Sequence, residues 1–216
     1  LSLVGGIVLG SIAARTRRRW LDSGISGTSV ALFSVPNFWL GMLLIIVFAI
    51  WLDWLPTGGM APYGQSGIQP QYLVLPVITM ATTELAYKTR IMRSSMIESL
   101  GQDFIDTARS KGLSSSRVLW RHAMPHALLP MISVAGYSLG FILAGSILIE
   151  RVFGWPGMGL LFFDAIERKN NMVVLGIVIV LTVTIIVVNI LTDLVYGLVD
   201  PRLRARLMPQ RREVAA

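Results

Sequence analysis

Long apolar runs, separated by short segments that carry most of the charge, are the dominant pattern of this chain. Three runs have the length needed to cross a bilayer: 25 residues at Thr28–Leu52, 23 at Ala127–Ile149 and 21 at Met172–Thr192. A hydrocarbon core of about 30 Å requires about 20 helical residues. The lengths of these runs therefore predict membrane-spanning helices.

For two further apolar runs, hydropathy alone does not decide whether they cross the membrane. Leu1–Ala14 is apolar, but at about 1.5 Å per residue it covers only about 21 Å as a helix. We interpret it as the last part of a span whose beginning is missing. Tyr72–Met92 is apolar in its first half and then contains Glu84, Lys88 and Arg90. With the other three, these runs predict about five transmembrane helices in an all-α membrane protein.

The distribution of basic residues indicates which segments cross the membrane. The segments 15–19, 88–126 and 202–212 contain 16 of the 19 Lys and Arg residues, and 150–171 contains the other three. This alternation follows the positive-inside rule only if Tyr72–Met92 also crosses. We therefore expect the central segment and the C-terminus to be cytoplasmic and the alternate loops to face outside.

Composition agrees with lipid as the solvent. The chain has 216 residues, of which 14% are charged, whereas soluble domains have about 25%. Cysteine is absent, which excludes disulfides and thiolate metal sites. The net charge of +7 does not indicate a nucleic-acid partner, because the basic residues lie in short loops between apolar runs. His122 and His126 have the i,i+4 spacing of a metal pair, but Pro125 stands between them and no acidic third ligand is near.

The central cytoplasmic segment has the pattern of two short helices joined by a glycine. Glu98–Lys111 predicts a helix, Gly112 is a natural stop, and Ser114 with the two serines after it offers N-caps for a second helix. Pro125 is expected to end that second helix. On physical grounds the element either docks into a groove of a soluble partner or lies on the lipid headgroups as an amphipathic linker.

This segment resembles the "EAA" loop of ABC importer permeases, whose pattern is E-A-A-x3-G-x9-I-x-L-P. Asp106-Thr107-Ala108 stands at the E-A-A position, Gly112 follows after three residues, and Met124-Pro125 stands at the L-P spacing. Where this segment departs from that pattern, it resembles the permeases of the dipeptide/oligopeptide/nickel branch, which carry TARAKGL, RHAL and ALLP blocks. Four more blocks resemble that branch in order along the chain: SVPNFWLG at 34–41, RSSM at 93–96, ERVFGWPGMG at 150–159 and DLVYGLVDPR at 193–202.

The resemblance implies a helical bundle like that of ABC type I importer permeases, in a bacterial plasma (inner) membrane. Residues 1–200 would form the transmembrane permease domain, with a coupling loop at about 93–126, and 201–216 a basic cytosolic tail. The implied partners are a second homologous permease, two ATPase subunits and an extracytoplasmic substrate-binding (lipo)protein. No cofactor is expected in this chain, because ATP and Mg would bind the ATPases. The residues implied to couple to an ATPase are Phe104, Asp106, Thr107, Ala108, Arg109, Gly112 and Leu113.

The implied cargo is short peptides, with nickel, glutathione or another small solute as the alternative within the same branch. An intramembrane enzyme would need a buried catalytic pair, and the sequence shows none beyond Glu84. The chain also lacks a Gly-rich phosphate loop, so we expect no ATP hydrolysis by this chain alone. A stand-alone channel or ion-coupled carrier would not need the cytoplasmic helix pair.

Two polar residues within apolar runs are candidates for the transport pathway. Glu84 either lines that pathway or pairs with Lys88 one helical turn later, and we favour the pair. Asn189 either lines an inner vestibule with Asp193 or bridges helices, and we favour the bridge. Small residues four apart predict a smooth helix-packing face at Gly136, Gly140 and Ala144.

Overall fold

The protein is described here from a computed structural model, which covers residues 1–16, 18–65, 67–143 and 147–199. Within these ranges the regular secondary structure is helical, and the predicted all-α class is confirmed. The expected tail 201–216 and the packing residue Ala144 lie outside the described residues. The elements are α1 (Ser2–Arg15), α2 (Arg19–Ser34), α3 (Asn37–Leu44), η1 (Ile45–Trp51), α4 (Pro70–Leu100), α5 (Asp103–Ser110), α6 (Ser115–Arg117), η2 (Val118–Ala123), α7 (Met124–Leu143), α8 (Ile147–Phe153), α9 (Met158–Glu167) and α10 (Asn171–Val199).

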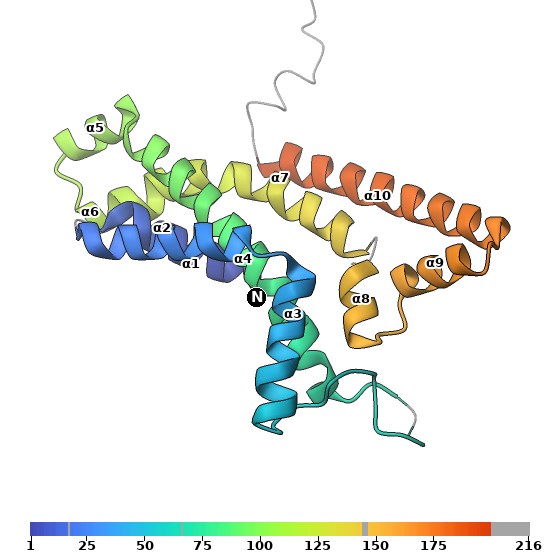
Figure 1. Cartoon of the computed structure of the whole chain (residues 1–216). Helices are drawn as coiled ribbons and strands as arrows, with labels where there is room; N and C mark the ends of the chain where they lie inside the picture. The colour runs from blue at the N-terminus through green and yellow to red at the C-terminus, as the bar shows by residue number, and fades with distance from the viewer. Residues whose placement is uncertain (17, 66, 144–146, 200–216) are drawn as a thin grey trace, which may run out of the picture.

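Helix α4 is the centre of the bundle, and α1 packs along it (Figure 1). Small residues four apart make this contact possible. A Cβ atom at Gly6 would lie 2.5 Å from Cβ of Lys88, and one at Gly10 would lie 2.6 Å from the carbonyl oxygen of Thr89. The backbones of α1 and α4 therefore approach too closely for any larger side chain at these two positions.

Helices α7 and α10 run side by side on the other side of the bundle (Figure 1). A Cβ atom at Gly136 would lie 2.1 Å from Cγ2 of Thr192, so α10 rests directly on this glycine. At Gly140 the nearest atom, Cγ1 of Val188, would be at an ordinary contact distance of 3.9 Å. Both contacts lie within this chain.

One helix of the described ranges, α10, is long and apolar enough to cross a membrane without help. Trp20–Ser34 and Asn37–Trp51 pass the same criterion only when they are taken together. Helix α4 has 31 residues, about 46 Å at the usual helical rise, but it contains the charged residues noted above. The number of five spans stays a prediction.

The predicted continuous helix Thr28–Leu52 is wrong, because α2 and the α3–η1 helix meet at an angle of 97°. Val35 and Pro36 are both extended, with ψ of 125° and 132°. A proline disfavours helical backbone in the residue before it, and its ring removes one N–H donor. The apolar run therefore contains a corner that its hydropathy does not reveal.

The predicted run Ala127–Ile149 does not follow one axis, because α8, which begins beyond residues 144–146, runs in a different direction from α7 (Figure 1). Ile149 and Phe153 of α8 are buried in a cluster with Ala49 and Leu75. This packing against η1 and α4 directs α8 away from the axis of α7. Hydropathy reports that a segment is apolar, and it does not report the neighbour against which the segment packs.

Pro125 does not end the second helix of the central segment, which corrects another prediction. The helix passes from α6 through the π-helical turn η2 into α7, and Pro125 is the second residue of α7. In η2 the N–H of Met124 donates to the carbonyl of Leu119, five residues earlier. A widened turn of this kind relieves the clash between a proline ring and the preceding turn.

Candidate functional site

The coupling segment, residues 101–123, contains α5, α6 and η2 and joins α4 to α7 at one end of the bundle (Figure 1). The single helix predicted over Glu98–Lys111 is wrong, because α4 ends at Leu100 and a turn at Gly101 precedes α5. Asp103 and Asp106 occupy the first turn of α5. Carboxylates there favour a new helix start by opposing the positive end of the helix dipole.

The glycine bend after α5 has the predicted form. Gly112 has φ of +75°, and its N–H donates to the carbonyl of Arg109 at 2.9 Å. This left-handed conformation is readily available to glycine and costs other residues about 1 kcal/mol or more. The prediction that Gly112 ends the first helix of the central segment is confirmed. Ser114 is the N-cap residue of the next helix, although its side chain does not cap it.

The inner face of α5 is buried against the bundle. Ile105 is fully buried and Ala108 is 5% exposed. They belong to one apolar cluster with residues of α4, η2 and α7, which includes Met92, Met96, Leu119, Ala123 and Met131. Phe104 and Leu113, which were expected to be coupling residues, are half-buried and pack against the same cluster. The short helix α5 is therefore held on the bundle by apolar contacts along one side.

The outer face of α5 is polar and exposed. Asp106 and Arg109 form an ion pair with 3.1 Å between Oδ1 and Nη1, and their side chains are 73% and 56% exposed. Thr107 is exposed, and its hydroxyl donates to the carbonyl of Asp103. The expected coupling residues are thus split between two faces, with Ala108 inward and Asp106, Thr107 and Arg109 outward.

His126 contributes a contact between the coupling segment and α7. Its ring lies 4.7 Å from the ring of Phe104, centroid to centroid. His122 is on η2, and no group of three or more metal-ligating side chains occurs within the described residues. The structure therefore uses His126 as a packing partner of α5.

Glu84 is at the centre of a polar cluster that joins three helices. Its carboxylate pairs with the ammonium of Lys88 on α4 and accepts a hydrogen bond of 2.6 Å from the Ser138 hydroxyl on α7. Lys88 is 2% exposed, and its ammonium also donates to the Ser2 hydroxyl on α1 at 3.3 Å. The cluster therefore balances a buried positive charge and connects α4 to both neighbours. The second pathway candidate, Asn189, lies on the exposed side of α10.

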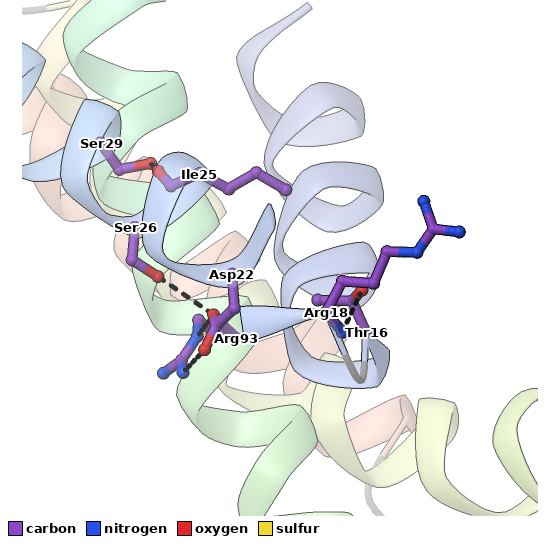
Figure 2. Close-up of polar contacts among 7 residues, drawn as sticks. All are labelled: Thr16, Arg18, Asp22, Ile25, Ser26, Ser29 and Arg93. Atoms are coloured by element: carbon purple, nitrogen blue, oxygen red, sulfur yellow. Dashed lines mark hydrogen bonds and ion pairs between the residues drawn. The ribbon is translucent and has the colours of Figure 1, made fainter. Parts of the chain in front are cut away.

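A second ion pair, between Asp22 of α2 and Arg93 of α4, was not assigned from the sequence. The guanidinium donates to both carboxylate oxygens, at 2.6 Å from Nε and 2.7 Å from Nη2 (Figure 2). The Ser26 hydroxyl donates to the same carboxylate at 3.3 Å. Arg93 begins a block that resembles the peptide permeases, but its partner is 71 residues away, and no sequence signal links the two.

The opposite end of the bundle contains α8, a glycine turn and α9. The Glu150 carboxylate accepts a hydrogen bond of 2.8 Å from the N–H of Leu160 in the first turn of α9. The Arg151 guanidinium forms ion pairs with two carboxylates of α9, with 3.6 Å from Nη1 to Oδ1 of Asp164 and 3.6 Å from Nη2 to Oε1 of Glu167. The block Glu150–Gly159 is therefore a structural unit that joins α8 to α9.

In the part of the chain that the structure describes, these features form an all-helical bundle with one long apolar helix, α10, and comparison with known proteins shows the class to which it belongs. Residues 6–205 match the family described as "Binding-protein-dependent transport system inner membrane component". The chain belongs to this family, and the resemblance to the peptide branch of ABC importer permeases is confirmed.

Several curated peptide permeases are similar to this chain. It is 37% identical over 206 residues to the oligopeptide transport system permease protein AppB of Bacillus subtilis, covering 94% of this chain and 65% of that protein. It is 38% identical over 224 residues to the dipeptide transport system permease protein DppB of Haemophilus influenzae, covering 94% of this chain and 67% of that protein. The di/tripeptide permease DppB of Pseudomonas aeruginosa is 37% identical, with 92% and 66% covered. The chain thus spans about two thirds of the length of the curated relatives it matches.

Proposed function

We propose that this chain is a permease subunit of an ATP-driven importer and that, with a second permease, it forms the pathway for short peptides. The names of the similar proteins support the cargo class, since they are oligopeptide, dipeptide and di/tripeptide permeases. The observation that carries the proposal is the position of α5. It is fixed to the bundle by one buried face and presents an exposed polar face to a partner.

The two faces of α5 have different roles in this proposal. Asp106, Thr107 and Arg109 form the docking face, because their side chains are exposed. Ala108 is a positioning residue that holds α5 against the bundle, and its burial keeps it from direct contact with a partner. Gly112 provides the bend that returns the chain toward α7.

Nucleotide-driven motion would reach the membrane helices through the apolar cluster beneath α5. Residues of α4, α5, η2 and α7 pack together in that cluster, so a displacement of α5 acts on α4 and α7 at once. Such a coupling needs two states of the bundle and a partner that favours one of them. ATP and Mg would be held by two ATPase subunits, and a substrate-binding (lipo)protein would deliver the cargo from outside.

The proposed orientation places the coupling segment, the C-terminus and the basic tail at 201–216 in the cytoplasm of a bacterium. It rests on the distribution of Lys and Arg. In this arrangement Glu84 connects helices, and Asn189, exposed on α10, remains a proposed pathway residue.

Single-cysteine crosslinking tests the docking face directly, because the 216 residues of this chain include no cysteine. In the assembled complex in native vesicles, Thr107→Cys should crosslink to an ATPase subunit. Ala108→Cys, on the buried face of the same helix, is the matched control and should not. Gln71→Cys, in the first turn of α4 and at the end of the segment 53–71 that is expected to face outside, should react with an impermeant maleimide added outside. If Thr107→Cys and Asp106→Cys react with maleimide but never capture an ATPase, the proposal is wrong.

The cargo is tested by ATPase stimulation in the reconstituted complex with its binding protein. Di-, tri- and oligopeptides should stimulate hydrolysis, whereas nickel and glutathione should not. Stimulation by nickel or glutathione with no response to any peptide would move the chain to the alternative cargo class. That outcome would leave the docking result unaffected.

A further inference from the structure

The block that joins α8 to α9 is built around one carboxylate, which two glycines enclose. The Glu150 carboxylate accepts its hydrogen bond of 2.8 Å from the N–H of Leu160, in the first turn of α9. A Cβ atom at Gly157 would overlap the carboxyl group of Glu150, and one at Gly159 would lie 3.0 Å from its Oε2. A carboxylate is favoured at this end of a helix, because the free N–H groups carry partial positive charge.

Arg151 also connects α8 to α9, but its contacts are weaker. Its ion pairs with Asp164 and Glu167 are both 3.6 Å long, and the guanidinium lies 5.2 Å from the centroid of the Phe163 ring. The Arg151 side chain is 49% exposed, so solvent screens these charges. Glu150 is therefore the polar contact that does most to fix the angle between α8 and α9.

Phe153, at the end of α8, attaches this hairpin to the bundle. Phe153 is 1% exposed, and its Cε2 would lie 3.1 Å from a Cβ atom at Gly41 of α3. Its carbonyl accepts a hydrogen bond of 2.8 Å from the N–H of Gly59, in the segment after η1. Side chain and backbone together therefore hold α8 against the α3–η1 helix.

The other end of the hairpin continues into α10 through a hydrogen-bonded junction (Figure 1). Lys169 has φ of +55°, and its N–H donates to the carbonyl of Ile166 at 2.9 Å. The N–H of Asn170 donates to the carbonyl of Ala165 at 2.8 Å. These two bonds are those of a Schellman motif at the end of a helix. The side-chain oxygen of Asn170 then accepts a hydrogen bond of 3.3 Å from the N–H of Val173 in α10, so both sides of the junction are fixed.

We propose that the α8–α9 hairpin is a rigid connector that makes α10 and the α3–η1 helix move together, and that Glu150 is the positioning residue that keeps it rigid. The inference rests on the proposed transport function, since a connector matters only if the helices move. Helix α10 packs on α7, and α7 contributes to the apolar cluster beneath α5. A displacement of α5 therefore reaches the α3–η1 helix through α7, α10 and the connector.

The test compares three substitutions of Glu150 in the reconstituted complex and measures peptide uptake per ATP hydrolysed. Glu150→Gln keeps the length and an acceptor for the Leu160 N–H, and should retain most of this ratio. Glu150→Asp keeps the charge but is one methylene shorter, so it should lose the ratio as Glu150→Ala does. The expected loss is about tenfold or more, which corresponds to one lost hydrogen bond to a charged group. Arg151→Gln, the control on the same helix, should change the ratio only about twofold.

The reverse order of these variants overturns the proposal. If Glu150→Asp retains uptake and Glu150→Gln loses it, the charge acts on the cargo and does not position α9. A wild-type ratio in Glu150→Ala overturns the proposal as well. Neither outcome changes the crosslinking of Thr107→Cys to an ATPase subunit, so failure of the connector is distinguishable from failure of the proposed function.

A second measurement leaves Glu150 intact and does not depend on the folding of its variants. Spin labels at Ile50→Cys on η1 and Met172→Cys at the start of α10, both exposed positions, report the distance across the connector. The distance distribution should be the same in the nucleotide-free complex and in a complex trapped with ATP and vanadate. A shift larger than the width of the nucleotide-free distribution overturns the proposal.

Discussion

Replacing Glu84 with Gln should strongly destabilise the permease, because the change leaves the Lys88 ammonium without its counter-charge. The glutamine side chain has nearly the same size and still accepts a hydrogen bond from Ser138, so the substitution removes mainly charge. Lys88 is 2% exposed, and its remaining partner is the neutral Ser2 hydroxyl at 3.3 Å. Breaking a buried ion pair by removing one partner costs about 3–5 kcal/mol.

The matched control removes both charges. Glu84→Gln with Lys88→Met should recover most of the loss, since it leaves no buried charge unpaired, and a double-mutant cycle should give a coupling energy of at least about 2 kcal/mol. At roughly 2–4 °C per kcal/mol for a chain of this size, the single variant should lower Tm by about 6–20 °C. Thermal unfolding of the purified complex, followed by fluorescence, measures both values.

Two results would refute this reasoning. One is a Glu84→Gln complex that unfolds at the wild-type temperature, and the other is a double variant that is less stable than either single variant. If stability were unchanged and peptide uptake were lost, Glu84 would act on cargo rather than hold helices together. The experiment therefore distinguishes the two roles that the sequence left open for this carboxylate.

Two other contacts give predictions of different size. Gly136→Ala should destabilise the complex by about 1–3 kcal/mol, as is usual for overpacking, because the new Cβ would lie 2.1 Å from Cγ2 of Thr192. The control Gly176→Ala, whose new Cβ would meet nothing within 4 Å, should leave the stability unchanged. Equal Tm values for the two variants would contradict the close contact between α7 and α10. Asp22→Asn should lower the free energy of unfolding by only about 1 kcal/mol, since the side chains of Asp22 and Arg93 are both about 30% exposed and solvent screens their charges. The charge-exchanged variant, Asp22→Arg with Arg93→Asp, should restore the Tm. If this double variant loses as much stability as Asp22→Asn, the two residues do not form a specific pair.

Local signals predicted the features that depend on a few neighbouring residues. The length of the Met172–Thr192 run predicted the long apolar helix α10, and a glycine after an amphipathic stretch predicted the left-handed bend at Gly112. The i,i+4 spacing predicted the pair of Glu84 and Lys88, which the structure contains. In each case the cause lies within one or two turns of the chain, where sequence spacing and spatial distance agree.

Features that depend on distant neighbours were not accessible in this way. Asp22 and Arg93 are separated by 71 residues, and Ser138 reaches Glu84 across 54, so no spacing rule applies to either contact. The inward direction of Ala108 follows from the packing of α5 on α4 and η2, which a motif does not encode. Apolarity along 127–149 likewise gave no indication that α8 packs against η1 and Leu75.

The corner at Val35 and Pro36 has a consequence for the surrounding lipid. The two helices that meet at this corner, Trp20–Ser34 and Asn37–Trp51, are its limbs. The limb Asn37–Trp51 has 15 residues, about 22 Å of helix, so it is shorter than the thickness of the hydrocarbon layer when it stands upright. The two limbs reach across about 30 Å together only if both tilt far beyond the 20° or so that is usual for membrane helices. When Asn37–Trp51 stands upright, the protein imposes a hydrophobic mismatch at this point, and the bilayer beside the corner must become thinner or give way to another polypeptide.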